Sequence, residues 1–280
     1  QTPDAVRERW TRVLRSLDAP PDDAESYALM ERLAFDPATP NSILNCIANA
    51  RENARQLREH VSSEMWEQIN RLYLSIKDTK LDDTWRTEPH TLFVSIKEGI
   101  HLFQGITDST MNYNEGYQFI QVGRYIERAG AVARLLDVHY RGLTLPDGSY
   151  SRDSLEWIGL LKSCTAFEAY CKVYTADVQP ELTAEFLILN PEFPHSLAFA
   201  VDRIRAALLT IGDQTDSRKG RSVNRLAGRL AAMVDYGQVD EIFDVGLHRY
   251  LDDVARNCAY VHDAIYKAYI YYDVVQEFSD

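Results

Sequence analysis

The sequence predicts an all-α fold, a multi-helix bundle built from a duplicated helical unit of about 150 residues. Apolar residues recur at spacings of three and four over long stretches, as they do along one side of an α-helix. Glycine and proline, which interrupt regular structure, number only 13 and 10 among 280 residues, whereas average usage would bring them to about 12% together. The alternating patterns of β-strands are absent from the sequence. We therefore expect long helices that bury their apolar sides against one another.

The first clear helix covers residues 41–61. Asn41 and Ser42 can cap its start, because their side chains accept a hydrogen bond from a free backbone amide. The same patterns predict helices at about 88–111, 115–141 and 247–278. The apolar stripe of the first helix is Leu44, Ile47, Ala54, Leu57 and Val61, and that of the last is Leu251, Val254, Cys258, Val261, Ile265 and Tyr272.

The helix at 115–141 is apolar around much of its circumference, so it should be central in the bundle. One apolar stripe is flanked by a second one, which contains Tyr125, Val132 and Leu135. The first stripe consists of Phe119, Val122, Ile126, Ala129, Ala133, Leu136 and Tyr140.

An internal repeat supports the duplication. Two pairs of segments match in the same order, at offsets of 147 and 154 residues. They predict pseudo-repeats at about 1–112 and 113–280 within a single helical domain that covers 1–280. The second copy begins with the helix at 115–141, so we expect the first copy to have a corresponding helix upstream of Gln1. The matching segments are Trp10–Ser16 with Trp157–Ser163, and 33–43 with 187–197.

Composition excludes several classes of function. The net charge of −12 argues against a nucleic-acid partner, which needs clustered positive charge. No apolar run approaches the roughly 18 residues that cross a membrane, so we expect a soluble protein. Four cysteines without a Cys-x-x-Cys pair indicate buried thiols in a reducing cytoplasm. Only Glu98 and His101 combine the Glu-x-x-His spacing with a plausible helix, so neither a metal site nor a cofactor is expected.

Charged residues follow a third stripe of the helix at 115–141, where Glu127, Arg134, Asp137 and Arg141 are spaced by three, four and seven. On a central helix such charges must be paired, because an isolated buried charge is very unfavourable. Asp137 can pair along the helix with Arg134 and Arg141. Glu127 needs Arg124 or a partner from another helix.

The helix at 41–61 offers such partners in Arg51, Arg55 and Arg58. We expect the two helices to face each other through a network of arginines and carboxylates. Either this network sets the helix register as part of a structural core, or it lines a cavity for an anionic ligand, because guanidinium groups match carboxylate or phosphate. The residues of this ligand or structural charge network are Arg51, Arg55, Arg58, Arg124, Glu127, Arg128, Arg134 and Asp137.

A basic island interrupts the acidic sequence. It is either a solvated helix end or a docking patch for an acidic partner or an anionic substrate. The island consists of Arg218, Lys219, Arg221, Arg225 and Arg229.

Ser196 is predicted to be a helix N-cap rather than a nucleophile, because it aligns with Ser42 in the repeat. Tyrosines of the last helix pack in the core or form a subunit interface in an oligomer. The tyrosines are Tyr250, Tyr260, Tyr266, Tyr269, Tyr271 and Tyr272.

Several of these segments resemble the alpha-E family, bacterial all-helical proteins with a Glu-Arg motif. The resemblance covers essentially the whole chain. One departure is that members of the family usually begin with a first Glu-Arg helix and this sequence starts after it, which agrees with the helix expected upstream of Gln1. The resembling residues are Ser42-Ile43, Ala50–Arg55, Arg58, Glu64, Trp66, Asn70, Glu127-Arg128, Ala133–Asp137, Phe186–Asn190, Phe193–Ser196 and Gly228–Leu230.

The resemblance implies an association with circularly permuted ATP-grasp proteins and with transglutaminase-like cysteine peptidases. Our first hypothesis is an accessory or scaffold subunit of an ATP-grasp-centred system that forms amide bonds or modifies peptides, and that holds a carboxylate ligand or a partner. The second is an enzyme that acts on a small peptide or amino-acid conjugate through an interior site around Glu127 and neighbouring arginines.

Overall fold

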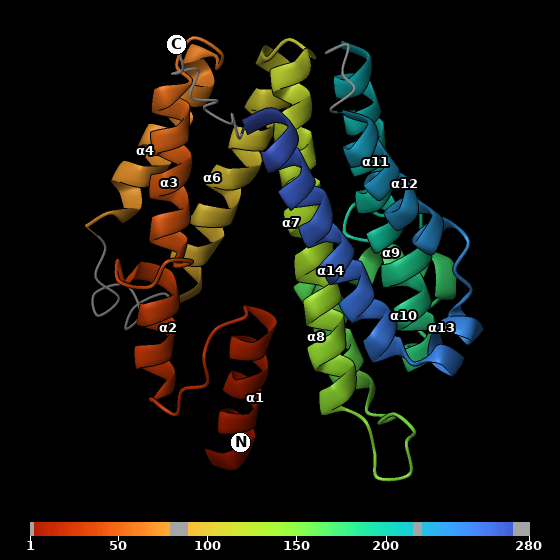
Figure 1. The fold of residues 1–280 in the computed structure, drawn as a ribbon. Coiled ribbons are helices and arrows are strands. Elements are labelled where there is room, and N and C mark those ends of the chain that lie inside the picture. Colours follow the sequence, from red (N-terminus) through yellow and green to blue (C-terminus); the bar gives the residue numbers. More distant parts are fainter. Residues whose placement is uncertain (1–2, 79–88, 215–219, 271–280) are drawn as a thin grey trace, which may run out of the picture. The chain divides into compact units, whose positions relative to one another are not determined.

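The computed structural model describes residues 3–78, 89–214 and 220–270, and within these ranges the protein is all-α. Helices run from α1 to α14, followed by the π-helical turn η1, and the described ranges contain no strand (Figure 1). An isolated bridge between Thr144 and Tyr150 closes the loop after α7. The predicted fold class is confirmed. The duplication and the division into one domain with two pseudo-repeats stay predictions.

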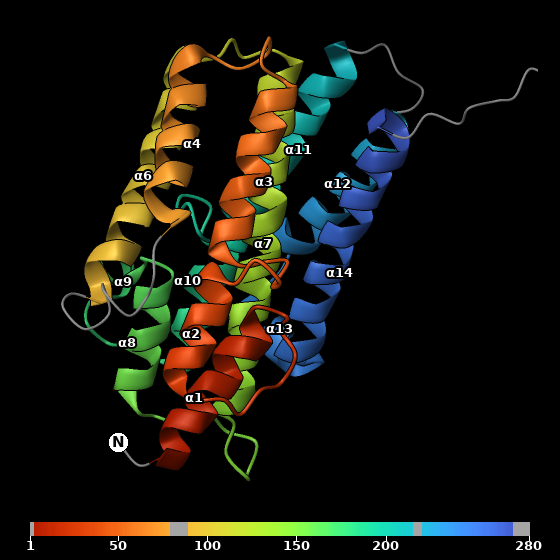
Figure 2. The same cartoon turned by 90° about the vertical axis from the view of Figure 1, so that its left-hand side faces the viewer.

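The chain forms two compact units. Unit 2 comprises residues 22–116, and unit 1 comprises residues 1–21 together with 117–280. In unit 2, α4 packs against both α3 and α6, and α2 packs against α3 (Figure 2). The core of this unit includes Ile47, Leu72 and Ile96. Its helices are α2 (Ser26–Phe35), α3 (Ile43–Gln56), α4 (Ser63–Ile76) and α6 (Pro89–Thr110).

The helix predicted at 41–61 begins as expected, because Ser42 is the N-cap of α3 and its hydroxyl accepts from the amide of Asn45 at 3.3 Å. The prediction is wrong at the other end, where α3 stops at Gln56. Leu57 leaves the helical conformation, with φ −103° and ψ 33°, and its side chain is 54% exposed. Ser62 then caps a separate helix, α4, so the chain turns where the periodicity indicated continuity.

Unit 1 contains the remaining helices. Among these, α11 and α12 pack against each other, and both α10 and α14 pack against α12. The helices are α1 (Pro3–Ser16), α7 (Glu115–Gly142), α8 (Ser154–Ser163), α9 (Phe167–Tyr174), α10 (Pro180–Leu189), α11 (Leu197–Gln214), α12 (Gly220–Asp235), α13 (Val239–Val245) and α14 (Leu247–Ile265), with η1 at Tyr266–Ile270.

The core of unit 1 confirms two predicted stripes except at Phe119, which is only partly buried. Helix α7 buries Val122, Ile126, Ala129, Ala133, Leu136 and Tyr140. Helix α14 buries Leu251, Val254, Cys258, Val261 and Ile265. The last helix was predicted to reach 278, but its α-helical part ends at Ile265 and Tyr272 lies outside the described residues. At its start Gly246 has φ +107°, a conformation that glycine adopts readily, and this turn separates α13 from α14.

Equivalent turns occur in the two segments that the repeat aligned. Helices α2 and α10 each contain ten residues, and both of their ends are 154 residues apart. Asp36 and Asn190 end these helices with nearly the same geometry, φ −69° with ψ 117° and 118°. Ser196 caps α11 as Ser42 caps α3, and its hydroxyl accepts from the amide of Phe199 at 3.0 Å. These local likenesses agree with the predicted repeat.

Candidate functional site

Arg51 on α3 is held against one side of α4. Its Nε donates to Oδ1 of Asn70 at 2.5 Å. The amide nitrogen of Asn70 donates in turn to the carbonyl of Trp66 at 2.9 Å, which orients the oxygen towards Arg51. The guanidinium carbon lies 4.9 Å from the ring centre of Tyr73 and 5.7 Å from that of Trp66, within cation–π range. Arg51 itself is half-buried.

The other two arginines of α3 have different partners. Arg55 makes a forked pair with Glu52, with contacts of 2.8 and 2.7 Å. Hydrogen bonds from Arg55, and then from Gln56, lower the pKa of Glu52 to about 2. Arg58 donates to the carbonyl of Val61 at 3.3 Å and to the hydroxyl of Ser63 at 3.2 Å. All these contacts lie within unit 2, so the predicted facing of this helix with the helix at 115–141 stays a prediction.

The charged stripe of α7 is less buried than expected. Glu127 and Arg141 are exposed, so the expected interior position is wrong for these two residues. Arg134 is half-buried, and its Nε is buried without a hydrogen-bond partner in the described part of the chain. Glu127 and Arg134 both act on the buried thiol of Cys258 on α14. The stripe therefore borders α14, where its outer members remain in solvent.

Arg124 and Arg128 flank the buried ring of Tyr125. Their guanidinium carbons lie 5.6 and 5.1 Å from the ring centre. Arg128 also donates to the carbonyl of Pro194 at 3.0 Å, in the turn before α11. Burial lowers the pKa of Arg128, Tyr125 opposes this change, and the nearby charge of Arg124 adds to it. These two arginines therefore pack against aromatic and backbone groups of unit 1.

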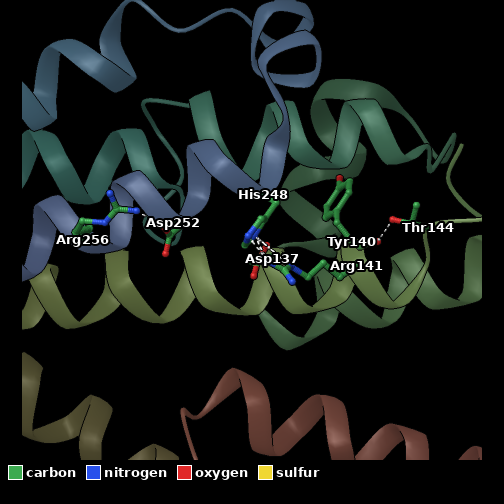
Figure 3. Close-up of polar contacts among 7 residues, drawn as sticks. All are labelled: Asp137, Tyr140, Arg141, Thr144, His248, Asp252 and Arg256. Carbon is green, nitrogen blue, oxygen red and sulfur yellow. Dashed lines mark hydrogen bonds and ion pairs between the residues drawn. The ribbon is translucent and has the colours of Figure 1, made fainter. Parts of the chain in front are cut away.

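Asp137 joins α7 to α14 through a histidine that the sequence analysis did not single out. Its Oδ1 lies 2.5 Å from Nδ1 of His248 and 3.2 Å from Nε of Arg141, which confirms the predicted pairing of Asp137 with Arg141. Figure 3 shows His248 directed at Asp137, with Arg141 beside both. Arg141 also contacts Nε2 of His248. The cluster therefore connects α7 to α14.

The basic island lies partly on α12. Arg221, Arg225 and Arg229 are exposed at successive turns, and we call these three residues the α12 stripe. None of the three takes part in an ion pair of the described residues. Arg218 and Lys219 lie outside the described residues. The rest of the helix faces the core through Val223, Ala227, Leu230, Ala231 and Val234.

The predictions for Ser196, for the cysteines and for the tyrosines of the last helix are confirmed only in part. Ser196 is a helix cap, as predicted. Burial raises the pKa of both Cys164 and Cys258 to about 12, which keeps these thiols protonated, whereas Cys46 is exposed and Cys171 is half-buried. The expectation of four buried thiols is therefore wrong for Cys46 and only partly met by Cys171. Tyrosines outside the core include Tyr260 and Tyr266, which are 51% and 49% exposed.

Two kinds of feature are absent from the described residues. None of the helices there combines the length and the apolar character needed to cross a membrane. No group of three or more metal-binding side chains is found in the same residues.

The sequence matches the model of one family over residues 2–270. That family is Alpha-E, described as a predicted alpha-helical domain with a conserved ER motif. Relatives include an uncharacterized protein of Mycobacterium bovis, 21% identical over 203 residues, and one of Mycobacterium tuberculosis, 20% identical over 203 residues. Each alignment covers 71% of this chain but 22% of the relative, so the chain spans about a fifth of these relatives' length. No solved structure matches.

Proposed function

The chain belongs to the Alpha-E family, and on that premise we propose that it is a helical accessory or scaffold subunit of an ATP-grasp-centred system. Such a system forms amide bonds or modifies small peptides. The proposed partners are a circularly permuted ATP-grasp protein and a transglutaminase-like peptidase, as the family resemblance implies. In this role the chain would bind a partner protein and leave the chemistry of amide formation to it.

The observation that carries the proposal is the α12 stripe. Its three guanidinium groups recur every four residues, about 6 Å along the helix axis. They project from a chain whose net charge is −12, and no described carboxylate pairs with them. Unpaired surface cations of this kind accelerate the encounter with an acidic surface and select it over other partners. We therefore place the docking of an acidic partner segment at α12.

A charge-reversal experiment tests this role. The full-length protein would be co-purified with the ATP-grasp protein encoded beside it, as wild type and as the triple variant Arg221→Glu, Arg225→Glu and Arg229→Glu. A matched control reverses three other exposed cations, Arg71, Lys97 and Arg249, which changes the net charge by the same amount. We expect the α12 variant to lose the complex at least about tenfold, and the control to keep it.

Activity assays separate the accessory role from the alternative of an independent enzyme. Each component would be incubated alone and together with ATP and amino acids. We expect amide product only when the ATP-grasp protein is present, and a change in its turnover when the helical protein is added. Amide product from the helical protein alone would contradict the accessory role. Equal loss of the complex in the α12 variant and the control would remove the stripe as the docking surface.

A further inference from the structure

Arg51 presents a fixed guanidinium group with most of its hydrogen-bonding capacity unused. A guanidinium has five donors, and the contact described for Arg51 uses Nε alone, on Asn70. Among the described residues no acceptor is found for its two terminal nitrogens, Nη1 and Nη2. Arg51 is half-buried between α3 and α4, but its terminal nitrogens are not among the fully buried unpaired side-chain atoms of the described residues, so both stay open to a ligand. A guanidinium that is held in place and has two open donors suits a ligand with two matching acceptors.

Arg55, one helical turn further along α3, provides an internal contrast. Its Nε and Nη2 donate to the two carboxylate oxygens of Glu52, at 2.8 and 2.7 Å. The side chain of Arg55 is 61% exposed. Glu52 also accepts from Gln56 at 3.1 Å. The carboxylate nearest to Arg51 in the sequence therefore already has two partners. Arg51 instead lies over aromatic rings, which keep its plane in place without neutralising its charge.

We propose that Arg51 binds a small carboxylate ligand through the fork formed by Nη1 and Nη2. The two terminal nitrogens match the two oxygens of one planar carboxylate, and the rings of Trp66 and Tyr73 border the place that the apolar body of the ligand would occupy. Arg58, whose guanidinium carbon lies 6.0 Å from the ring centre of Trp66, adds positive charge nearby. Its terminal nitrogens already donate to Val61 and Ser63.

A carboxylate suits this site better than a phosphate. The arrangement supplies one open fork, which satisfies one singly charged planar group. A phosphate dianion carries more charge and more acceptors, and Arg58 has its donors engaged elsewhere. The Arg51 site belongs to unit 2, whereas the α12 stripe belongs to unit 1. Failure of one proposal therefore leaves the other standing.

Binding of benzoate by the full chain tests the proposal. Calorimetric and NMR titrations would compare benzoate with benzamide, which has the same shape without the charge, and with inorganic phosphate. We expect benzoate to bind at least about tenfold more tightly than benzamide and phosphate, and to shift the Nε resonance of Arg51. Equal affinity for benzoate and benzamide, tighter binding of phosphate, or no binding of benzoate would overturn the assignment.

Variants locate the binding on Arg51. Arg51→Gln should weaken benzoate at least about tenfold, whereas Arg55→Gln, the matched control on the same helix, should stay within about twofold. Arg51→Lys keeps the charge and loses the fork, so an intermediate loss is expected. Unchanged affinity in Arg51→Gln would exclude this site. If that variant does not fold, Arg51→Lys and the comparison of ligands on the wild type still decide the question.

Discussion

His139 on α7 lies edge-on against the buried ring of Trp157 on α8, with ring centroids 5.4 Å apart and an interplanar angle of 67°. Its Nε2 is buried and has no hydrogen-bond partner within the described ranges. Burial, and then the charge of Arg12, lower the pKa of His139 to about 4, with Glu156 acting in the opposite direction. The imidazole is therefore neutral at pH 7 in the folded protein, which gives unit 1 a specific sensitivity to acid.

Acid should destabilise the protein through His139. The histidine has its ordinary pKa near 6.5 when unfolded and a pKa of about 4 when folded, so the unfolded state takes up the proton first as the pH falls. The contribution of His139 to the free energy of unfolding is complete above pH 6.5 and is lost between pH 6.5 and 4. The total loss is on the order of 3 kcal/mol. Urea unfolding of wild type and His139→Phe at pH 7, 5.5 and 4.5 measures it. As the pH falls, the unfolding free energy of the wild type should decrease relative to that of the variant. Parallel pH profiles would contradict this account.

Two glycines of α6 should respond differently to alanine. A Cβ on Gly105 would meet no atom within 4 Å, whereas a Cβ on Gly99 would lie 2.8 Å from Cδ1 of Leu72, a core residue. Gly105→Ala should raise the free energy of unfolding by about 1 kcal/mol through helix propensity. At Gly99 the displacement of Leu72 should remove most of that gain. Chemical denaturation measures both, and equal gains would show that Leu72 moves without cost.

The two capping serines offer a paired test. Ser196 accepts from the amide of Phe199 and donates to the carbonyl of Asn190, while the contact described for Ser42 is the longer bond from Asn45. Both are fully buried. We expect Ser196→Ala to lower the free energy of unfolding by about 2 kcal/mol and Ser42→Ala by about 1 kcal/mol. The reverse order would contradict the assigned hydrogen bonds.

Thiol reactivity should separate the cysteines by location. Cys46 is exposed, so it should react within minutes with an aromatic disulfide reagent at pH 8. Cys164 and Cys258, with pKa values raised to about 12 by burial, should react only after unfolding. Cys46→Ser removes the fast phase and serves as the control. Fast labelling of two or more thiols in that variant would show that unit 1 opens locally.

Much of the fold follows from local patterns. The stripes of α7 and α14 and the caps at Ser42 and Ser196 lie where the sequence placed them, because helical periodicity and capping involve residues within a few positions of each other. The end of the first predicted helix at Gln56 was missed. Leu57 fits the apolar spacing of the helix before it. Periodicity alone therefore does not show that Ser62 caps a new helix.

The candidate site divides in the same way. By itself the sequence determined which arginines and carboxylates share a helix side, and it paired Asp137 with Arg141 correctly. Only the tertiary structure decided that Arg51 lies against Asn70 and Tyr73 of α4, that His248 joins Asp137 across 111 residues, and that Glu127 is exposed. Spacing along a chain specifies a direction around a helix, whereas the partner in that direction depends on how helices pack. That packing depends on burial and shape across the whole unit.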